Sequence, residues 1–151
     1  MLREELNQTL KSAMKAKEAR TVSTVRLILA ALKDRDIAAR GDGNMEGISE
    51  DAILALLQAM IKQRRESIEM YEKGGRPELA QQETDEIDVI ERFLPTPLSE
   101  AEAAAAIDSA IAETSAKTLK DIGRVMSVLK AQYAGRMDFS KAGPAVKAKL
   151  T

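Results

Sequence analysis

Two helical stretches of the sequence carry a charged side chain where an apolar one is expected. Arg64 interrupts an apolar stripe between Ile61 and Ile68, and Glu83 interrupts the stripe of the following stretch. Because successive helices commonly pack antiparallel, we expect Arg64 to meet Glu83, with Glu86 as the rival partner. Such a pair fixes the register of two helices, whereas a carboxylate there can also act as an acid or base. The structural interpretation is favoured, because ion pairs perturb carboxylates without catalysis.

Basic residues gather toward the end of the chain. Residues 117–151 hold 8 Lys and Arg against 2 Asp and Glu, a net charge of +6. Such side chains can neutralise phosphates without reading bases. The alternative is that cations near helix ends complement the helix dipole and aid solubility. The hypothesis of a phosphate-binding surface names six residues: Lys120, Arg124, Lys130, Arg136, Lys141 and Lys147.

Missing residue types narrow the chemistry. The chain has no Cys, no His and no Trp, which excludes thiolate nucleophiles and the Ser-His-Asp triad and removes the commonest metal ligand. Asp85 and Asp88 can share a divalent ion, yet oxygen ligands on one regular helix rarely complete a coordination shell. We therefore predict no catalytic residue, no metal site and no cofactor.

The composition is that of a globular helical protein, with 44% hydrophobic, 31% charged and 3% aromatic residues. Residues 1–17 carry charges throughout and lack the apolar core of a secretory signal. No apolar run approaches the length of a membrane span. We expect a cytoplasmic protein that contacts neither membrane nor DNA.

Helical periodicity supplies the elements that position these residues. Apolar side chains recur at helical spacing over 2–17, 21–40, 49–73 and 76–94. Gly74 ends the third of these stretches, and Pro95 with Pro97 prevents the fourth from continuing. Ser99 with Glu102 predicts a capping box that opens a helix over 100–114. Later helices are expected over 119–133 and from residue 138 or 140 onward.

No segment alternates as a strand does, so we predict an all-α fold of two small domains. Residues 1–94 should form a four-helix, bundle-like domain, and residues 99–151 a three-helix domain. Residues 95–98 are the expected Pro-rich linker.

Six blocks of sequence, in order along nearly the whole chain, resemble the GatB/YqeY family. The family's C-terminal module also forms the tail of the B subunit of the tRNA-dependent amidotransferase. Two departures are Phe93, where the family usually has Tyr, and Gly143-Pro144 inside the expected last helix, which favours a late start or a kink. The blocks are VRLILAALK (25–33), IKQRRESI (61–68), GRPELA (75–80), Glu83, Glu86 and Ile87 followed by FLP (93–95), DIGRVM (121–126) and GRMD (135–138).

The resemblance implies an all-helical, two-domain fold and a family-level activity, carbon–nitrogen ligation with glutamine as amide-nitrogen donor. In the amidotransferase the tail engages tRNA while the chemistry resides in other domains, which have no counterpart here. The resemblance thus implies a non-catalytic accessory module, with tRNA or a tRNA-processing complex as its partner and the six cations as contacts. Two alternatives stay open: a protein-interaction adaptor, and an enzyme that uses carboxylates around Glu83.

Overall fold

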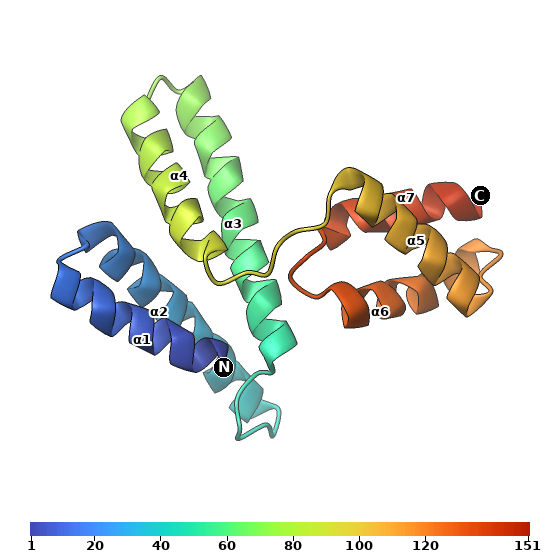
Figure 1. Cartoon of the computed structure of the whole chain (residues 1–151), viewed down its shortest axis with the longest axis horizontal. Helices are drawn as coiled ribbons and strands as arrows, with labels where there is room; N and C mark the ends of the chain where they lie inside the picture. Colours follow the sequence, from blue (N-terminus) through green and yellow to red (C-terminus); the bar gives the residue numbers. More distant parts are fainter. The chain divides into compact units, whose positions relative to one another are not determined.

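A computed structural model describes residues 1–151, and every regular element in it is helical. The predicted all-α fold is therefore confirmed. No helix has both the length and the apolar character that a membrane crossing requires. The elements are α1 (Leu2–Ala16), α2 (Ala19–Gly41), α3 (Glu50–Lys73), α4 (Pro77–Glu91), α5 (Glu100–Thr114), the 3-10 turn η1 (Leu119–Asp121), α6 (Ile122–Tyr133) and α7 (Phe139–Leu150) (Figure 1).

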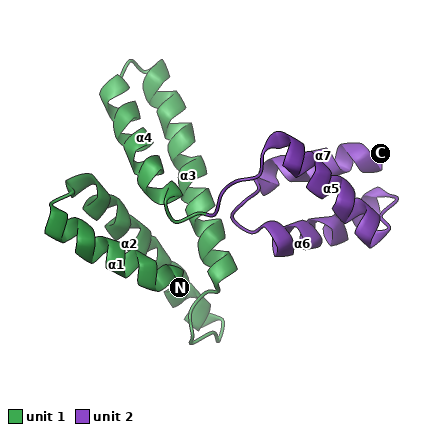
Figure 2. Cartoon of the chain, in the orientation of Figure 1, with its two compact units in different colours: residues 1–94 green, residues 95–151 purple.

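The chain divides into two compact units, residues 1–94 (unit 1) and residues 95–151 (unit 2) (Figure 2). Residues 95–98, expected as a linker, group with unit 2. The backbone N–H of Leu98 donates to the carbonyl of Arg136 at 2.9 Å, and Arg136 Nε donates to the carbonyl of Thr96 at 2.9 Å. That the two units are separate domains stays a prediction.

Unit 1 consists of two helical hairpins. Helices α1 and α2 are joined at Lys17, whose φ of 58° is left-handed, and α3 and α4 are joined at Gly75, whose φ is +70°. Helix α2 also packs against α4, which brings the hairpins together. Their shared core includes the fully buried side chains of Leu6, Ile28, Ile53, Leu57 and Ile90.

The apolar stripe of α1 turns away from this core along the helix. Leu2 and Leu6 are buried, but Met14 is 51% exposed and Ala13 is buried near it instead. A step of four residues rotates a position by about 40° beyond a full turn. Three such steps separate Leu2 from Met14, so Met14 reaches the side of the hairpin.

Unit 2 has a smaller core, between α5, α6 and α7. Ser99 forms the capping box with Glu102, through two hydrogen bonds of 3.1 Å. The helix expected over 119–133 begins as η1 and becomes α-helical at Ile122. Helix α7 starts at Phe139, behind an Asp138 cap, so the late start that Pro144 suggested is wrong; Pro144 lies within the helix. The buried side chains are Ala106, Ile107, Ala110, Val125, Leu129, Met137, Ala142, Val146 and Leu150.

Candidate functional site

Arg64 on α3 lies against two glutamates of α4. Its Nε is 2.9 Å from Glu86 Oε2 and 3.9 Å from Glu83 Oε2, and its NH1 donates to the carbonyl of Met60 at 3.2 Å. The closer partner is thus Glu86, and the expectation that Arg64 meets Glu83 first is wrong. The two glutamates also differ in burial, because the Glu86 side chain is 11% exposed and the Glu83 side chain 21%.

Glu83 and Glu86 both lie near the Arg64 guanidinium, but at different distances from it. Partial burial, and then the negative charge of Glu86, raise the pKa of Glu83 above its usual value, against the opposing effect of Arg64. These three residues line neither of the two cavities described below. Their contacts join α3 to α4, and whether their role is structural or chemical stays a prediction that variants can test.

A second polar cluster, which the sequence did not predict, joins α1, α2 and the loop before α3. Arg3 donates two hydrogen bonds to the carboxylate of Asp36, at 2.7 and 2.8 Å, and a third to the carbonyl of Ile48 at 3.1 Å. Asp36 also accepts from the backbone N–H of Ile48 at 2.9 Å. The hydrogen bond from Arg3, helped by Ile48, lowers the pKa of Asp36 from 3.8 to about 2.

Gly47 packs directly against this second cluster. Its φ is +94°, and a Cβ added there would lie 2.8 Å from both the Arg3 guanidinium and the Asp36 carboxylate. Both the backbone conformation and the available space therefore favour glycine. In the sequence, the only sign of this cluster is Gly47 itself, two residues before the Ser49 cap of α3. That glycine does not indicate that Arg3 and Asp36 are its neighbours.

The six cations predicted to bind phosphate all belong to unit 2, but two of them have partners there. Arg124 NH2 lies 2.5 Å from Asp121 Oδ1, and Arg136 holds the carbonyl of Thr96. No carboxylate lies within 4.0 Å of the other four ammonium groups, and all four side chains are exposed. These four, called here the unit 2 lysines, are Lys120, Lys130, Lys141 and Lys147.

Helix geometry spreads these cations around unit 2. Arg124 and Lys130 are six residues apart on α6, which at about 100° per residue turns them about 120° from each other. Lys141 and Lys147 have the same spacing on α7. The structure therefore does not bring the six side chains together as one cluster.

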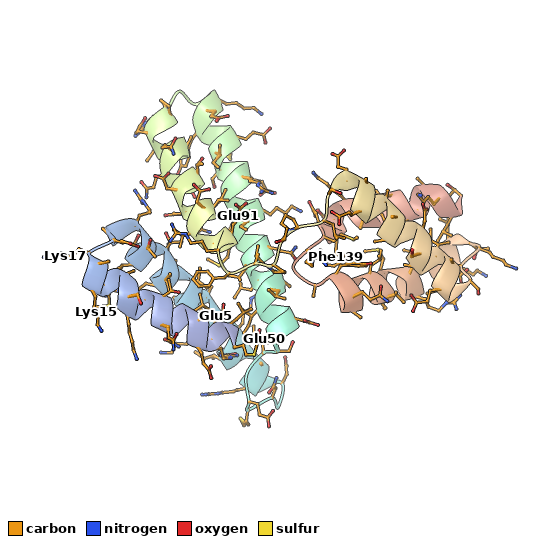
Figure 3. The ribbon with its side chains drawn as sticks, in the orientation of Figure 1. Glu5, Lys15, Lys17, Glu50, Glu91 and Phe139 are labelled. Carbon is orange, nitrogen blue, oxygen red and sulfur yellow. The ribbon has the colours of Figure 1, made fainter.

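Two cavities open beside the α1–α2 hairpin of unit 1. The first has a volume of about 350 Å³ and is lined by Arg3, Asn7, Leu29, Leu32, Lys33, Asp36, Ile37 and Arg40. The second, of about 470 Å³, lies at the end of the hairpin where Lys15 and Lys17 project (Figure 3). It is lined by Met14, Lys17, Ala19, Val22, Ser23 and Arg26.

Comparison with known proteins identifies the class. The family model described as Yqey-like protein matches residues 3–150, so the chain belongs to the YqeY-like family. This agrees with the resemblance seen in the sequence blocks.

Curated relatives share the name Altered inheritance of mitochondria protein 41, mitochondrial. The protein of Lachancea thermotolerans is 35% identical over 89 residues, 59% of this chain and 46% of the relative. That of Eremothecium gossypii is 34% identical over 102 residues, covering 67% and 54%. That of Meyerozyma guilliermondii is 38% identical over 89 residues, covering 59% and 44%. The chain spans about half the length of the curated relatives it matches.

These names correct one expectation. The relatives are named as mitochondrial proteins, which contradicts the expected cytoplasmic location. That expectation rested on a missing secretory signal over residues 1–17. A secretory signal is recognised by its apolar core, and its absence carries no information about import into mitochondria.

Proposed function

We propose that the protein is a non-catalytic accessory module of tRNA-dependent amidation, which binds tRNA through unit 2. One observation carries the proposal: the unit 2 lysines are exposed and lack a carboxylate partner within 4.0 Å. Membership of the YqeY-like family over residues 3–150 supports it, given the resemblance to the amidotransferase tail. Ammonium groups without an internal partner can neutralise the phosphates of an RNA without reading its bases.

The proposal predicts a binding reaction that depends strongly on salt. Each phosphate contact releases counterions, so the logarithm of affinity falls linearly with the logarithm of salt concentration. Titration of unfractionated tRNA against the whole protein, at several salt concentrations, measures the slope. No binding even at low salt would contradict the proposal.

Charge-neutralising variants locate the surface. Replacing the unit 2 lysines by Gln should weaken binding and lower the magnitude of the salt slope by about 3, close to one for each phosphate that is no longer neutralised. A control variant changes the net charge equally with exposed, unpaired lysines of unit 1. An equal loss of affinity in both variants would show attraction to net charge rather than a surface on unit 2. The control substitutions are Lys11→Gln, Lys15→Gln, Lys62→Gln and Lys73→Gln.

A further inference from the structure

One side of the α1–α2 hairpin repeats a simple pattern of side chains. On α2, the cations Arg26, Lys33 and Arg40 follow one another at seven-residue intervals, and Val22 and Leu29 keep the same interval. Seven residues complete two turns to within about 20°, so all five positions share one face of the helix. All five also line one or other of the two cavities.

Helix α1 supplies the opposite edge of the same face. Arg3, Asn7 and Met14 line the cavities and lie within about 40° of one another around α1. The two cavities therefore follow one another along the same face of the α1–α2 hairpin, and we call this face, with its two cavities, the hairpin groove. Apolar surface is accessible at both ends, because Met14 is 51% exposed and Ile37 is 54% exposed.

The charges along the hairpin groove are not neutralised within the protein. Lys17, Arg26, Lys33 and Arg40 have no carboxylate within 4.0 Å. The one acidic residue that lines the groove is Asp36, and Arg3 binds it through two hydrogen bonds. Residues 1–41 hold 9 basic and 5 acidic residues, whereas residues 42–94 hold 6 and 13. The positive charge of unit 1 is thus concentrated on the hairpin that carries the groove.

We propose that the hairpin groove binds an acidic, amphipathic helix of a partner protein. Val22 and Leu29, each followed four residues later by a cation, place charges beside an apolar strip, as the charged positions that flank the apolar seam of a coiled-coil helix do. Acids spaced seven apart on a partner helix recur about every 10.5 Å, as Arg26, Lys33 and Arg40 do. A phosphate backbone would use the cations but would leave Met14, Val22 and Leu29 uncovered. A helix uses both.

A designed peptide tests the proposal on the whole protein. The probe is a synthetic helical peptide of about 18 residues, with Leu on one face and Glu at every seventh position beside it. Its binding should perturb the amide resonances of the groove-lining residues in a ¹⁵N-labelled sample. A peptide with the same residues in scrambled order should bind at least about tenfold more weakly. Equal binding of the scrambled peptide would reduce the effect to net charge and overturn the proposal.

Charge reversal gives a sharper test. The variant Arg26→Glu, Lys33→Glu, Arg40→Glu should lose peptide affinity by at least about tenfold, and a peptide with Lys in place of Glu should bind this variant in preference to the wild type. The matched control reverses three exposed cations of the same hairpin that line neither cavity. It should bind the acidic peptide within about twofold of the wild type. The control substitutions are Lys15→Glu, Arg20→Glu and Arg35→Glu.

Other occupants of the hairpin groove give different results. Analytical ultracentrifugation can show whether the wild type is a homodimer that the charge-reversal variant dissociates. Such a result would assign the groove to a second copy of the chain and overturn the proposal. So would a single-stranded RNA that binds through Arg26, Lys33 and Arg40 when the peptide does not. The proposal is separable from tRNA binding, because neutralising the unit 2 lysines should leave peptide affinity unchanged.

Discussion

The two units connect their helices by different polar contacts. In unit 1 the strongest ones join elements far apart in the sequence, as between Arg3 and Asp36 or between Arg64 and Glu86. In unit 2 three of the six carboxylates bind groups within four residues, as Glu102 does with Ser99, and the two that contact another helix, Asp108 and Glu113, are exposed. Polar groups of unit 1 therefore determine how helices fit together, whereas those of unit 2 mainly determine where helices begin. Disrupting a polar contact should thus destabilise unit 1 more than unit 2.

The largest expected effect is at Gly47. Gly47→Ala should lower the free energy of unfolding by about 3 kcal/mol, because the new Cβ meets the Arg3–Asp36 pair and φ is +94°. Gly43→Ala is the matched control, since Gly43 has a φ of +93° and open space around it. It should cost only about 1 kcal/mol, from the backbone alone. Urea unfolding followed by circular dichroism measures both, and equal costs would mean that the polar cluster contributes nothing.

The next effect separates the two glutamates beside Arg64. At pH 7, Glu86→Gln should cost about 2–3 kcal/mol, because a mostly buried guanidinium loses its closest charged partner. Glu83→Gln should be neutral or slightly stabilising. The raised pKa of Glu83 means that its ionised form is disfavoured in the folded state, and Gln removes that charge.

Denaturant unfolding of the two single variants at neutral pH provides this measurement. A larger loss of stability in Glu83→Gln than in Glu86→Gln would reverse the assignment of the main partner. Loss of a catalytic turnover in a fully stable Glu83→Gln protein would instead favour the carboxylate enzyme.

The acid dependence of stability gives a smaller effect. The folded pKa of Asp36 is about 2, below its usual 3.8, so its ionisation stabilises the folded state above about pH 4. That contribution, on the order of 1–2 kcal/mol, should disappear as the pH falls from about 4 through 2. Unfolding free energies of the wild type and Asp36→Asn across this range should converge at the acid end. A constant difference would show that protonation of Asp36 is not involved.

Asp121 gives a test in unit 2 of the same acid dependence of stability that Asp36 gives in unit 1. The backbone N–H of Lys117, and then Arg124, lower its pKa to about 2 as well. The side chain of Arg124 is 61% exposed, so solvent screens this pair. Asp121→Asn should therefore flatten the acid dependence less than Asp36→Asn does.

The smallest effect concerns a helix cap of unit 2. Ser99→Ala removes the side-chain half of the capping box of α5 and should cost about 1 kcal/mol. Differential scanning calorimetry should show a modest decrease in the melting temperature. A destabilisation as large as that of Gly47→Ala would contradict the difference drawn between the two units.

Much of the fold could be predicted because its signals are local. Apolar periodicity located the seven α-helices, and the Ser99–Glu102 pair located the start of α5 correctly. The sequence did not determine whether Glu83 or Glu86 is the closer partner of Arg64. The two residues are three apart and share one side of α4, so periodicity brings both near Arg64 without deciding which is closer.

The remaining site features depend on tertiary structure. Arg3 and Asp36 are 33 residues apart, and neither interrupts an apolar stripe. The hairpin groove exists only because α1 and α2 lie side by side, so neither helix alone predicts it (Figure 1). A charge count over residues 117–151 identifies an excess of cations, but the direction of each one depends on its helix.

The hydrogen bonds that bind residues 96–98 to Arg136 have a practical consequence for dissecting the protein. A C-terminal fragment cut at Ser99, where the first helix of unit 2 is about to begin, would leave the Arg136 guanidinium and carbonyl without these partners. A fragment that starts at Pro95 keeps them. Experiments that isolate the carboxyl-terminal half should place the cut after Leu94.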